Sequence, residues 1–287
     1  MGYYESFVKK HPWQNVMVGE TKGKCLVGGN SKTALLIFPG SGQDAMSCFD
    51  LISAFEKKYK VIAVNYDGFY SVDSFFKFVE KILEKEKVMS VYLYGLSLGG
   101  FLVQHFVRRS GGRVKKLIIS HAAMIKSKTI IKKVIIPGKI MYFFLPLLPQ
   151  SLLNKFFIPV AGRVQSGNKD YMKLYKKYSS KINLEKRLEF ARKTTFSMLD
   201  KNYIKSVYKL GTDMQKLEKN FTPQDLLDWK GKILIIRTDN DPLAQDDGEF
   251  KKYYPNAKVV TFHKTGHLTP FIQFEKMAKE MDGFLRK

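Results

Sequence analysis

Six short runs of β-forming residues alternate with helical segments along much of this 287-residue chain. The runs are bounded by turn residues and lie at 33–38, 60–66, 90–95, 115–120, 232–238 and 257–262. Most of them are continuously apolar, which is typical of parallel strands covered on both faces. Helical periodicity falls between them, at 44–58, 72–87, 97–109 and 270–287. This order predicts an α/β fold with a mostly parallel central sheet flanked by helices.

The alternation stops after the run at 115–120 and resumes only at 232. The chain between these points is apolar, basic and broken by prolines, and then becomes rich in lysine and tyrosine. An insertion of this length between two strands of one sheet predicts a helical cap rather than a structureless loop. We therefore expect a first core segment at 1–122, a cap at 123–230 and a second core segment at 231–287.

A Gly-x-Ser-x-Gly pentapeptide, Gly95 to Gly99, lies where a predicted strand passes into a predicted helix. The pentapeptide alone is expected by chance in roughly one such chain in ten, so its setting carries the argument. A nucleophile on a tight, strained turn leaves no room for side chains two residues before and after it, which accounts for both glycines. The pattern predicts that Ser97 is a nucleophile at the C-terminal edge of the sheet.

A serine nucleophile needs a base, which is itself oriented by an acid. Among five histidines, His267 fits best because "KTGHLTPF" places it in a turn between the last strand and the last helix. The acid should follow the preceding strand, where "TDNDPLAQDD" supplies several carboxylates. We favour Asp241, which is far enough from the strand to turn back and is followed by the stiffening Pro242. Asp239 is the alternative.

The negative charge that develops during such a reaction needs two backbone N–H donors. One is expected from Leu98, directly after the nucleophile. The second is expected from the loop "FPGSGQDAM", with Ser41 preferred and Gly42 as the alternative, although an ordinary glycine turn explains this loop equally well. His121 follows the run at 115–120 and is a candidate for lining a pocket at the mouth of the cap.

The order of strand, glycine loop, serine elbow, post-strand aspartate and C-terminal Gly-His resembles the α/β-hydrolase superfamily over almost the whole chain except the cap. This resemblance implies the α/β-hydrolase fold, with the cap inserted after the sixth strand. "VYLYGLSLGGFLVQHFV" and "KVIAVNYDGFYSVDSF" further resemble the maspardin-like branch. The usual His-Gly of the oxyanion loop is Pro39-Gly40 here, which removes a supporting side chain but keeps the backbone donors.

Two main classes of function follow, and a small-molecule receptor with slow residual hydrolysis is a third possibility. The first is a serine hydrolase of the carboxylesterase, lipase or thioesterase type, which cleaves an ester or thioester with Ser97, Asp241 and His267 and needs no metal or organic cofactor. Ser97 argues against dehalogenase and epoxide-hydrolase chemistry, which usually needs an aspartate at the elbow; haloperoxidase-like and acyl-transfer chemistry stay open. The second class is a non-catalytic adaptor, because maspardin-like proteins often lack a complete triad. The retained Asp241 and His267 favour catalysis.

Positive charge is concentrated in the predicted cap. The chain has 49 lysines and arginines against 26 acidic residues, and residues 121–220 hold 21 against 6. This charge fits peripheral contact with an anionic membrane or an acidic substrate. It equally fits a solvated lysine-rich surface, which we slightly prefer, and no motif indicates nucleic-acid binding.

The aromatic content of the cap suits a substrate with an apolar acyl chain, although packing onto the sheet is the preferred role for most of Tyr142, Phe143, Phe144, Phe156 and Phe157. The first residues lack the apolar core of a signal peptide, and no apolar run reaches the roughly 18 residues that span a bilayer. We expect a cytoplasmic protein.

Overall fold

The computed structural model describes residues 2–124, 126–144, 149, 171–194, 200–243 and 248–287. Its centre is an eight-stranded sheet in the order β1-β2-β4-β3-β5-β6-β7-β8. The strands are Gln14–Val18 (β1), Thr21–Gly28 (β2), Thr33–Phe38 (β3), Lys60–Val64 (β4), Ser90–Leu96 (β5), Val114–Ser120 (β6), Lys232–Thr238 (β7) and Lys258–Phe262 (β8). All six predicted strands are present, and β3 to β8 pair in parallel, which confirms the predicted sheet.

The antiparallel pair β1 and β2 was not predicted. The two strands form a hairpin in which Gln14 pairs with Cys25, and β2 also pairs antiparallel with β4. Gly19 opens the two-residue turn with φ +57°, a conformation that glycine adopts without strain. Residues of β1 are only half-buried or exposed, because this strand lies at the edge of the sheet. Its short sequence therefore lacks the continuous apolar signal of the central strands.

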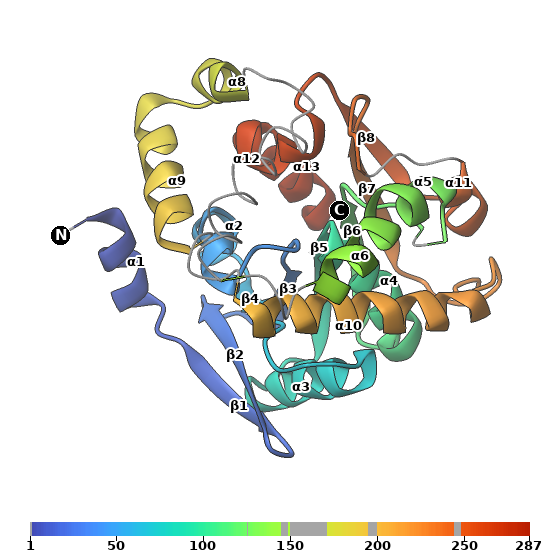
Figure 1. The fold of residues 1–287 in the computed structure, drawn as a ribbon. Coiled ribbons are helices and arrows are strands. Elements are labelled where there is room, and N and C mark those ends of the chain that lie inside the picture. Colours follow the sequence, from blue (N-terminus) through green and yellow to red (C-terminus); the bar gives the residue numbers. More distant parts are fainter. Residues whose placement is uncertain (1, 125, 145–148, 150–170, 195–199, 244–247) are drawn as a thin grey trace.

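Helices cover both faces of the sheet (Figure 1). The core helices are Tyr3–Lys10 (α1), Phe49–Phe55 (α2), Val72–Lys85 (α3), Leu98–Ser110 (α4), Glu249–Tyr253 (α11), Thr269–Ile272 (α12) and Phe274–Arg286 (α13). Apolar residues of α3 and α4 form one hydrophobic core, and those of α2 and α13 form a second. Ser71 accepts the N–H of Ser74 at 3.2 Å and caps the start of α3.

Between β6 and β7 most of the described chain is helical. The elements are Lys128–Ile130 (α5), a π-helical turn at Ile131–Ile135, Ile136–Phe144 (α6), Tyr171–Tyr178 (α8), Lys181–Thr194 (α9) and Lys201–Leu217 (α10). Helix α10 runs across the molecule between α6 and α3 (Figure 1) and contacts both. The insertion after the sixth strand is thus confirmed, whereas the division of the chain at residues 122 and 230 stays a prediction.

Helix α9 joins the insertion to the N-terminal segment. The Tyr4 N–H of α1 donates to Glu189 Oε1 at 3.1 Å. Phe190 stacks on Phe49 of α2 with ring centroids 3.7 Å apart, and its ring also meets Phe7 of α1. The buried Arg187 donates to Asp50 at 2.7 Å. The first helix of the chain and the insertion therefore share one packed interface.

None of the described helices is both long and apolar enough to cross a membrane.

Candidate active site

Ser97 lies on a sharp turn between β5 and α4. Its backbone has φ 52° and ψ −112°, a strained conformation for a residue with a side chain. The Ser97 N–H donates to the Ser120 carbonyl at 2.9 Å, which ties this turn to the end of β6. The side chain is half-buried. This arrangement has the form of a strand-to-helix nucleophile elbow.

The two flanking glycines are required by close backbone contacts. A Cβ atom on Gly95 would lie 2.2 Å from the carbonyl oxygen of Gly99. A Cβ atom on Gly99 would lie 1.9 Å from the carbonyl oxygen of Phe38, at the end of β3. Both separations are too short for real atoms, so the turn closes in this form only when both positions are glycine. Gly100 is similarly constrained by Ala122, which the sequence did not reveal.

His267 and Asp241 form a buried pair. His267 lies in a short 3₁₀ turn, Gly266–Leu268, after β8. Its Nδ1 atom is 2.8 Å from Asp241 Oδ2 and 3.1 Å from Oδ1. The two residues are 6% and 1% exposed. Because an ionised carboxylate only accepts hydrogen bonds, Nδ1 carries the proton and Nε2 is left as an acceptor.

The alternative carboxylate, Asp239, has a different partner. Its Oδ2 atom is 2.7 Å from Nδ1 of the exposed His263, and its Oδ1 accepts the Lys264 N–H. The hydrogen bond from His263 lowers the pKa of Asp239. Asp241 Oδ1, in turn, accepts the Leu243 N–H at 2.9 Å, which holds its carboxylate toward His267. The structure therefore pairs Asp241, and not Asp239, with His267.

His121 is buried beneath His267 rather than lining an open pocket, which corrects the expectation for this residue. It is 1% exposed, and its two ring nitrogens lie 2.9 Å from Ser120 Oγ and 2.9 Å from Thr238 Oγ1. Burial lowers the pKa of His121 to about 3. The ring is therefore neutral at neutral pH and belongs to the packed support of the site.

Thr269 is the residue to which other polar groups around His121 and His267 are hydrogen-bonded. It donates its hydroxyl proton to the Gly266 carbonyl at 2.9 Å. The hydroxyls of Thr238 and Thr265, each 2.6 Å from Thr269 Oγ1, must therefore both donate to it. Thr238 then has no proton for His121 and accepts from its Nε2–H. These directions define the neutral Nε2–H tautomer of His121 and fix the turn that carries His267.

Ser97 and His267 border the same dipeptide at the end of β6. The Ser97 N–H donates to Ser120, the first residue of the dipeptide. The ring of the second, His121, meets the His267 ring edge-on, with centroids 5.9 Å apart and an interplanar angle of 89°. The structure thus brings the elbow and the Asp241–His267 pair to one end of the sheet.

The backbone N–H groups in the loop after β3 differ in whether they already donate a hydrogen bond. Gly42 has φ +78°, and its N–H already donates to the hydroxyl of Tyr203 on α10 at 2.8 Å. Among the described residues, no hydrogen bond uses the N–H of Ser41. Leu98 is the first residue of α4, so its N–H has no partner within the helix. The geometry therefore favours Leu98 and Ser41 over Gly42.

Tyr203 is a site residue that the sequence did not reveal. Its hydroxyl accepts from Gly42 and donates to the Gln43 carbonyl at 3.2 Å, and its side chain is 2% exposed. Tyr66, buried below the loop, donates to the Pro39 carbonyl at 2.6 Å. These contacts cross more than 25 positions in the sequence, so no local pattern could predict them.

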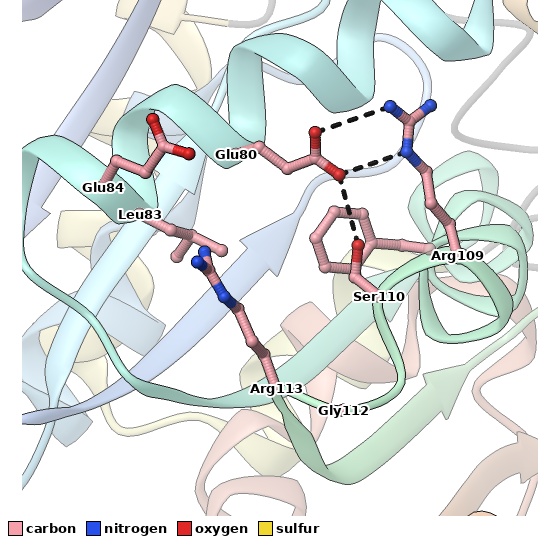
Figure 2. A pocket seen from close by; sticks show the side chains of 8 residues that line it. Glu80, Leu83, Glu84, Arg109, Ser110, Gly112 and Arg113 are labelled. Carbon is pink, nitrogen blue, oxygen red and sulfur yellow. Dashed lines mark hydrogen bonds and ion pairs between the residues drawn. The ribbon is translucent and has the colours of Figure 1, made fainter.

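A separate hollow of about 310 Å³ lies at the other end of the sheet (Figure 2). It is formed near the C-terminal ends of α3 and α4, just before β5 and β6 begin, and is lined by Glu80, Leu83, Glu84, Phe106, Arg109, Ser110, Gly112 and Arg113. Glu80 pairs with Arg109 at 3.1 Å and accepts from Ser110 (Figure 2). Ligands of open α/β sheets bind at the carboxyl ends of the strands, so this hollow is the weaker candidate site.

Within the described ranges, no group of three or more histidine, cysteine or acidic residues is arranged to hold a metal ion.

Comparison with known proteins agrees with this architecture. The family model described as alpha/beta hydrolase fold matches residues 33–273, which includes the elbow and the Asp241–His267 pair. The chain belongs to this family. No curated protein sequence matches the chain.

Several solved structures share the fold at low sequence identity. An alpha/beta hydrolase enzyme from a Medee basin deep-sea metagenome library has a TM-score of 0.72 at 16% identity, covering 96% of this chain and 98% of that one. The carboxylesterase CesB of Bacillus subtilis has a TM-score of 0.63 at 14% identity, covering 98% and 95%. A mutant of an epoxide hydrolase from Bacillus megaterium has a TM-score of 0.66 at 15% identity, covering 96% and 100%. At these identities the likeness establishes the fold alone.

Proposed function

We propose that this chain hydrolyses a carboxylic ester or thioester through an acyl-enzyme formed on Ser97. The observation that carries the proposal is the buried Asp241–His267 pair, whose 2.8 Å hydrogen bond leaves Nε2 of the imidazole as an acceptor. This pair and the strained serine elbow border the same dipeptide at the end of β6. A serine hydroxyl becomes an effective nucleophile when such a base removes its proton.

The proposed reaction has two halves. His267 takes the Ser97 proton as the hydroxyl oxygen attacks the carbonyl carbon, and Asp241 stabilises the resulting imidazolium. The backbone N–H groups of Leu98 and Ser41 donate to the negative oxygen of the tetrahedral intermediate. As the intermediate collapses, the imidazolium gives its proton to the departing oxygen or sulfur, which leaves as the alcohol or thiol. Water repeats the sequence on the acyl-enzyme and releases the acid.

The elbow residue separates this proposal from other reactions of the fold. Dehalogenase and epoxide-hydrolase chemistry usually uses a carboxylate nucleophile at the elbow, where this chain has Ser97. Haloperoxidase-like and acyl-transfer reactions use the same three residues as ester hydrolysis. Product analysis with and without an added alcohol acceptor distinguishes transfer from hydrolysis.

The cap aromatics divide into three groups. Tyr142 stacks on Tyr208 of α10 with centroids 4.0 Å apart, so it serves packing, as preferred for most of these residues. Phe143 and Phe144 are 75% and 48% exposed and fit neither predicted role. Phe156 and Phe157 lie outside the described residues. An ester with an apolar acyl chain stays a prediction from the sequence, and a chain-length series of p-nitrophenyl esters tests it.

The decisive experiment uses a fluorophosphonate probe of active-site serines. The wild type should be labelled, and Ser97→Ala should not be labelled and should lose ester hydrolysis by about 10⁴-fold or more. Ser41→Ala is the matched control, because it removes a hydroxyl beside the site but keeps the proposed backbone donor; its labelling should persist. A folded wild-type protein that shows no labelling would contradict the enzyme proposal and favour the non-catalytic adaptor.

A further inference from the structure

Helix α6 presents an apolar face to solvent. The face consists of Ile136, Ile140, Phe143 and Phe144, which are 48%, 57%, 75% and 48% exposed. Their spacing of four, three and one residues places them along one side of a helix with 3.6 residues per turn. Four large apolar side chains on one exposed stripe are unusual for the surface of a water-soluble domain.

The opposite side of the same helical segment anchors it to the protein. Ile130 is 2% exposed, and Ile135 packs against the core that contains α3 and α4. Tyr142 stacks on Tyr208 of α10. The π-helical turn at Ile131–Ile135 lies just before Pro137, which lacks a backbone donor and disturbs the preceding helical turn. The apolar face of α6 therefore points to solvent, because the other side of this segment packs against the core and α10.

Exposed lysines lie beside the apolar face. Lys128, Lys132 and Lys139 are exposed on this helical segment. From His121 to Lys169 the sequence contains eight lysines and arginines and no aspartate or glutamate. A helix with an apolar face, neighbouring lysines and no acidic residue is the pattern that binds in the plane of an anionic membrane surface.

We propose that the apolar face of α6 inserts into the headgroup region of an anionic phospholipid bilayer, held there by the adjacent lysines. The proposed contact is peripheral, with α6 lying in the plane of the membrane surface. The two contributions act together: the lysines attract anionic headgroups, and the isoleucine and phenylalanine side chains leave water.

The position of α6 connects this surface to the candidate active site. Helix α6 packs on α10, and Tyr203 of α10 bonds to the loop that contains Ser41. A bilayer bound at α6 thus lies against the insertion next to the carboxyl ends of the strands. This step rests on the proposed function and specifies its substrate as an ester of a membrane lipid. The membrane contact itself does not depend on catalysis.

Vesicle sedimentation tests the contact, using vesicles of phosphatidylcholine alone or with one-third phosphatidylserine. The wild type should bind the anionic vesicles and not the neutral ones. Ile140→Glu/Phe143→Glu should lower the partition coefficient at least about tenfold. The matched control is Met89→Glu, because Met89 is 81% exposed and lies just before β5, away from α6; its binding should equal that of the wild type.

A second pair of variants tests the charge. Lys132→Gln/Lys139→Gln should weaken binding about tenfold or more and reduce its dependence on salt. Lys251→Gln/Lys279→Gln removes the same charge from exposed positions outside the insertion and should have a much smaller effect. All substituted side chains are exposed, and thermal unfolding of each variant confirms that the fold is intact.

Three results would overturn the proposal: no binding of the wild type to anionic vesicles, equal binding of Ile140→Glu/Phe143→Glu, or a dimer without vesicle binding that Phe143→Glu dissociates. The last result would show that a second copy covers this face. Ser97→Ala should bind vesicles like the wild type. Binding without serine labelling would therefore keep the membrane contact and remove only the lipid-ester hydrolase proposal.

Discussion

His121 influences the charge that the candidate site can hold. Its ring lies edge-on to His267, and burial lowers the pKa of His121 to about 3. A protonated His121 at this distance would oppose the formation of an imidazolium on His267. Burial keeps the His121 ring neutral, and the threonine hydroxyls around it place the remaining proton of the neutral ring on Nε2.

Thr269→Val tests this support. The substitution keeps the shape of the side chain but leaves the Gly266 carbonyl, Thr238 and Thr265 without their shared partner. The free energy of unfolding should fall by about 1–3 kcal/mol, because unpaired buried polar groups carry a desolvation cost. Urea unfolding followed by circular dichroism measures this change.

Thr212→Val is the matched control. The Thr212 hydroxyl on α10 bonds only to a carbonyl of its own helix in an exposed position. Its loss should change stability by no more than about 0.5 kcal/mol. Equal effects of the two substitutions would contradict the role of Thr269 as the shared partner of these groups.

The sequence could predict those residues of the candidate site that come directly after a recognisable strand. Ser97, Asp241 and His267 each occupy a turn after a recognisable strand, and all three turns end at one edge of a parallel sheet. Distance along the loop already favoured Asp241 over Asp239 in the sequence, and the structure pairs Asp241 with His267 and Asp239 with His263. His121 looked accessible because the sequence cannot show that both of its ring nitrogens are already bonded.

Helix α10 connects the insertion to three separate loops of the core. Tyr203, Ser206 and Asp213 accept backbone N–H groups from Gly42 at 2.8 Å, Gly68 at 3.1 Å and Val72 at 2.8 Å, respectively. Their spacing of three and seven residues places them on one face of the helix. The helix therefore fixes the ends of β3 and β4 and the start of α3 together.

Tyr203→Phe should separate this positioning role from mere packing. Without the hydroxyl, the Gly42 N–H and the Gln43 carbonyl lose their partner, and the loop that carries Ser41 becomes less ordered. We expect a loss of about 1–3 kcal/mol in stability. In the proposed reaction, kcat should fall about tenfold with little change in KM, because the oxyanion donor acts in the transition state. Steady-state kinetics on a p-nitrophenyl ester measures both constants.

Tyr208→Phe on the same helix is the control. Its aromatic ring, which stacks on Tyr142, is retained by phenylalanine, so kcat and stability should stay close to wild type. A fall in kcat that is the same for both variants would show that the hydroxyl of Tyr203 has no special role.

At the level of elements, predictability followed the strength of local patterns. The strands at the centre of the sheet are buried on both faces and were evident as apolar runs. The β1–β2 hairpin was missed because an edge strand needs little apolar sequence. The insertion was predicted as helical, but the partners of α10 are set by contacts between residues 138 to 161 positions apart.

Two buried histidines make the stability of the whole molecule depend on pH. Burial lowers the pKa of His105 and of His121 to about 3, below the value of about 6.5 in an unfolded chain. Below pH 6.5 the unfolded chain gains protons that the folded protein does not take up. The contribution of the two neutral histidines to the free energy of unfolding is therefore fully present above pH 7. It falls toward pH 3, by up to about 1.4 kcal/mol per pH unit for each histidine.

Urea unfolding at pH 7.5 and pH 5.0 checks this dependence. His105→Gln should reduce the difference in the free energy of unfolding between the two conditions by about 2 kcal/mol. One histidine contributes about 1.4 kcal/mol per pH unit, over the roughly 1.5 units between its unfolded pKa of about 6.5 and pH 5.0. His263→Gln is the control, because His263 is exposed. A pH dependence that is identical in wild type and His105→Gln would contradict the burial argument.

The interface between α1 and α9 has a consequence for how the chain is made. Tyr4 and Glu189 are 185 positions apart, so α1 leaves the ribosome long before α9 and cannot dock until that later part of the chain has been made. Until then its tyrosine and phenylalanine rings remain in water. A fusion partner or affinity tag at the N-terminus would sit beside this late-forming interface, whereas the exposed Lys287 at the other end offers a site that leaves the docking undisturbed.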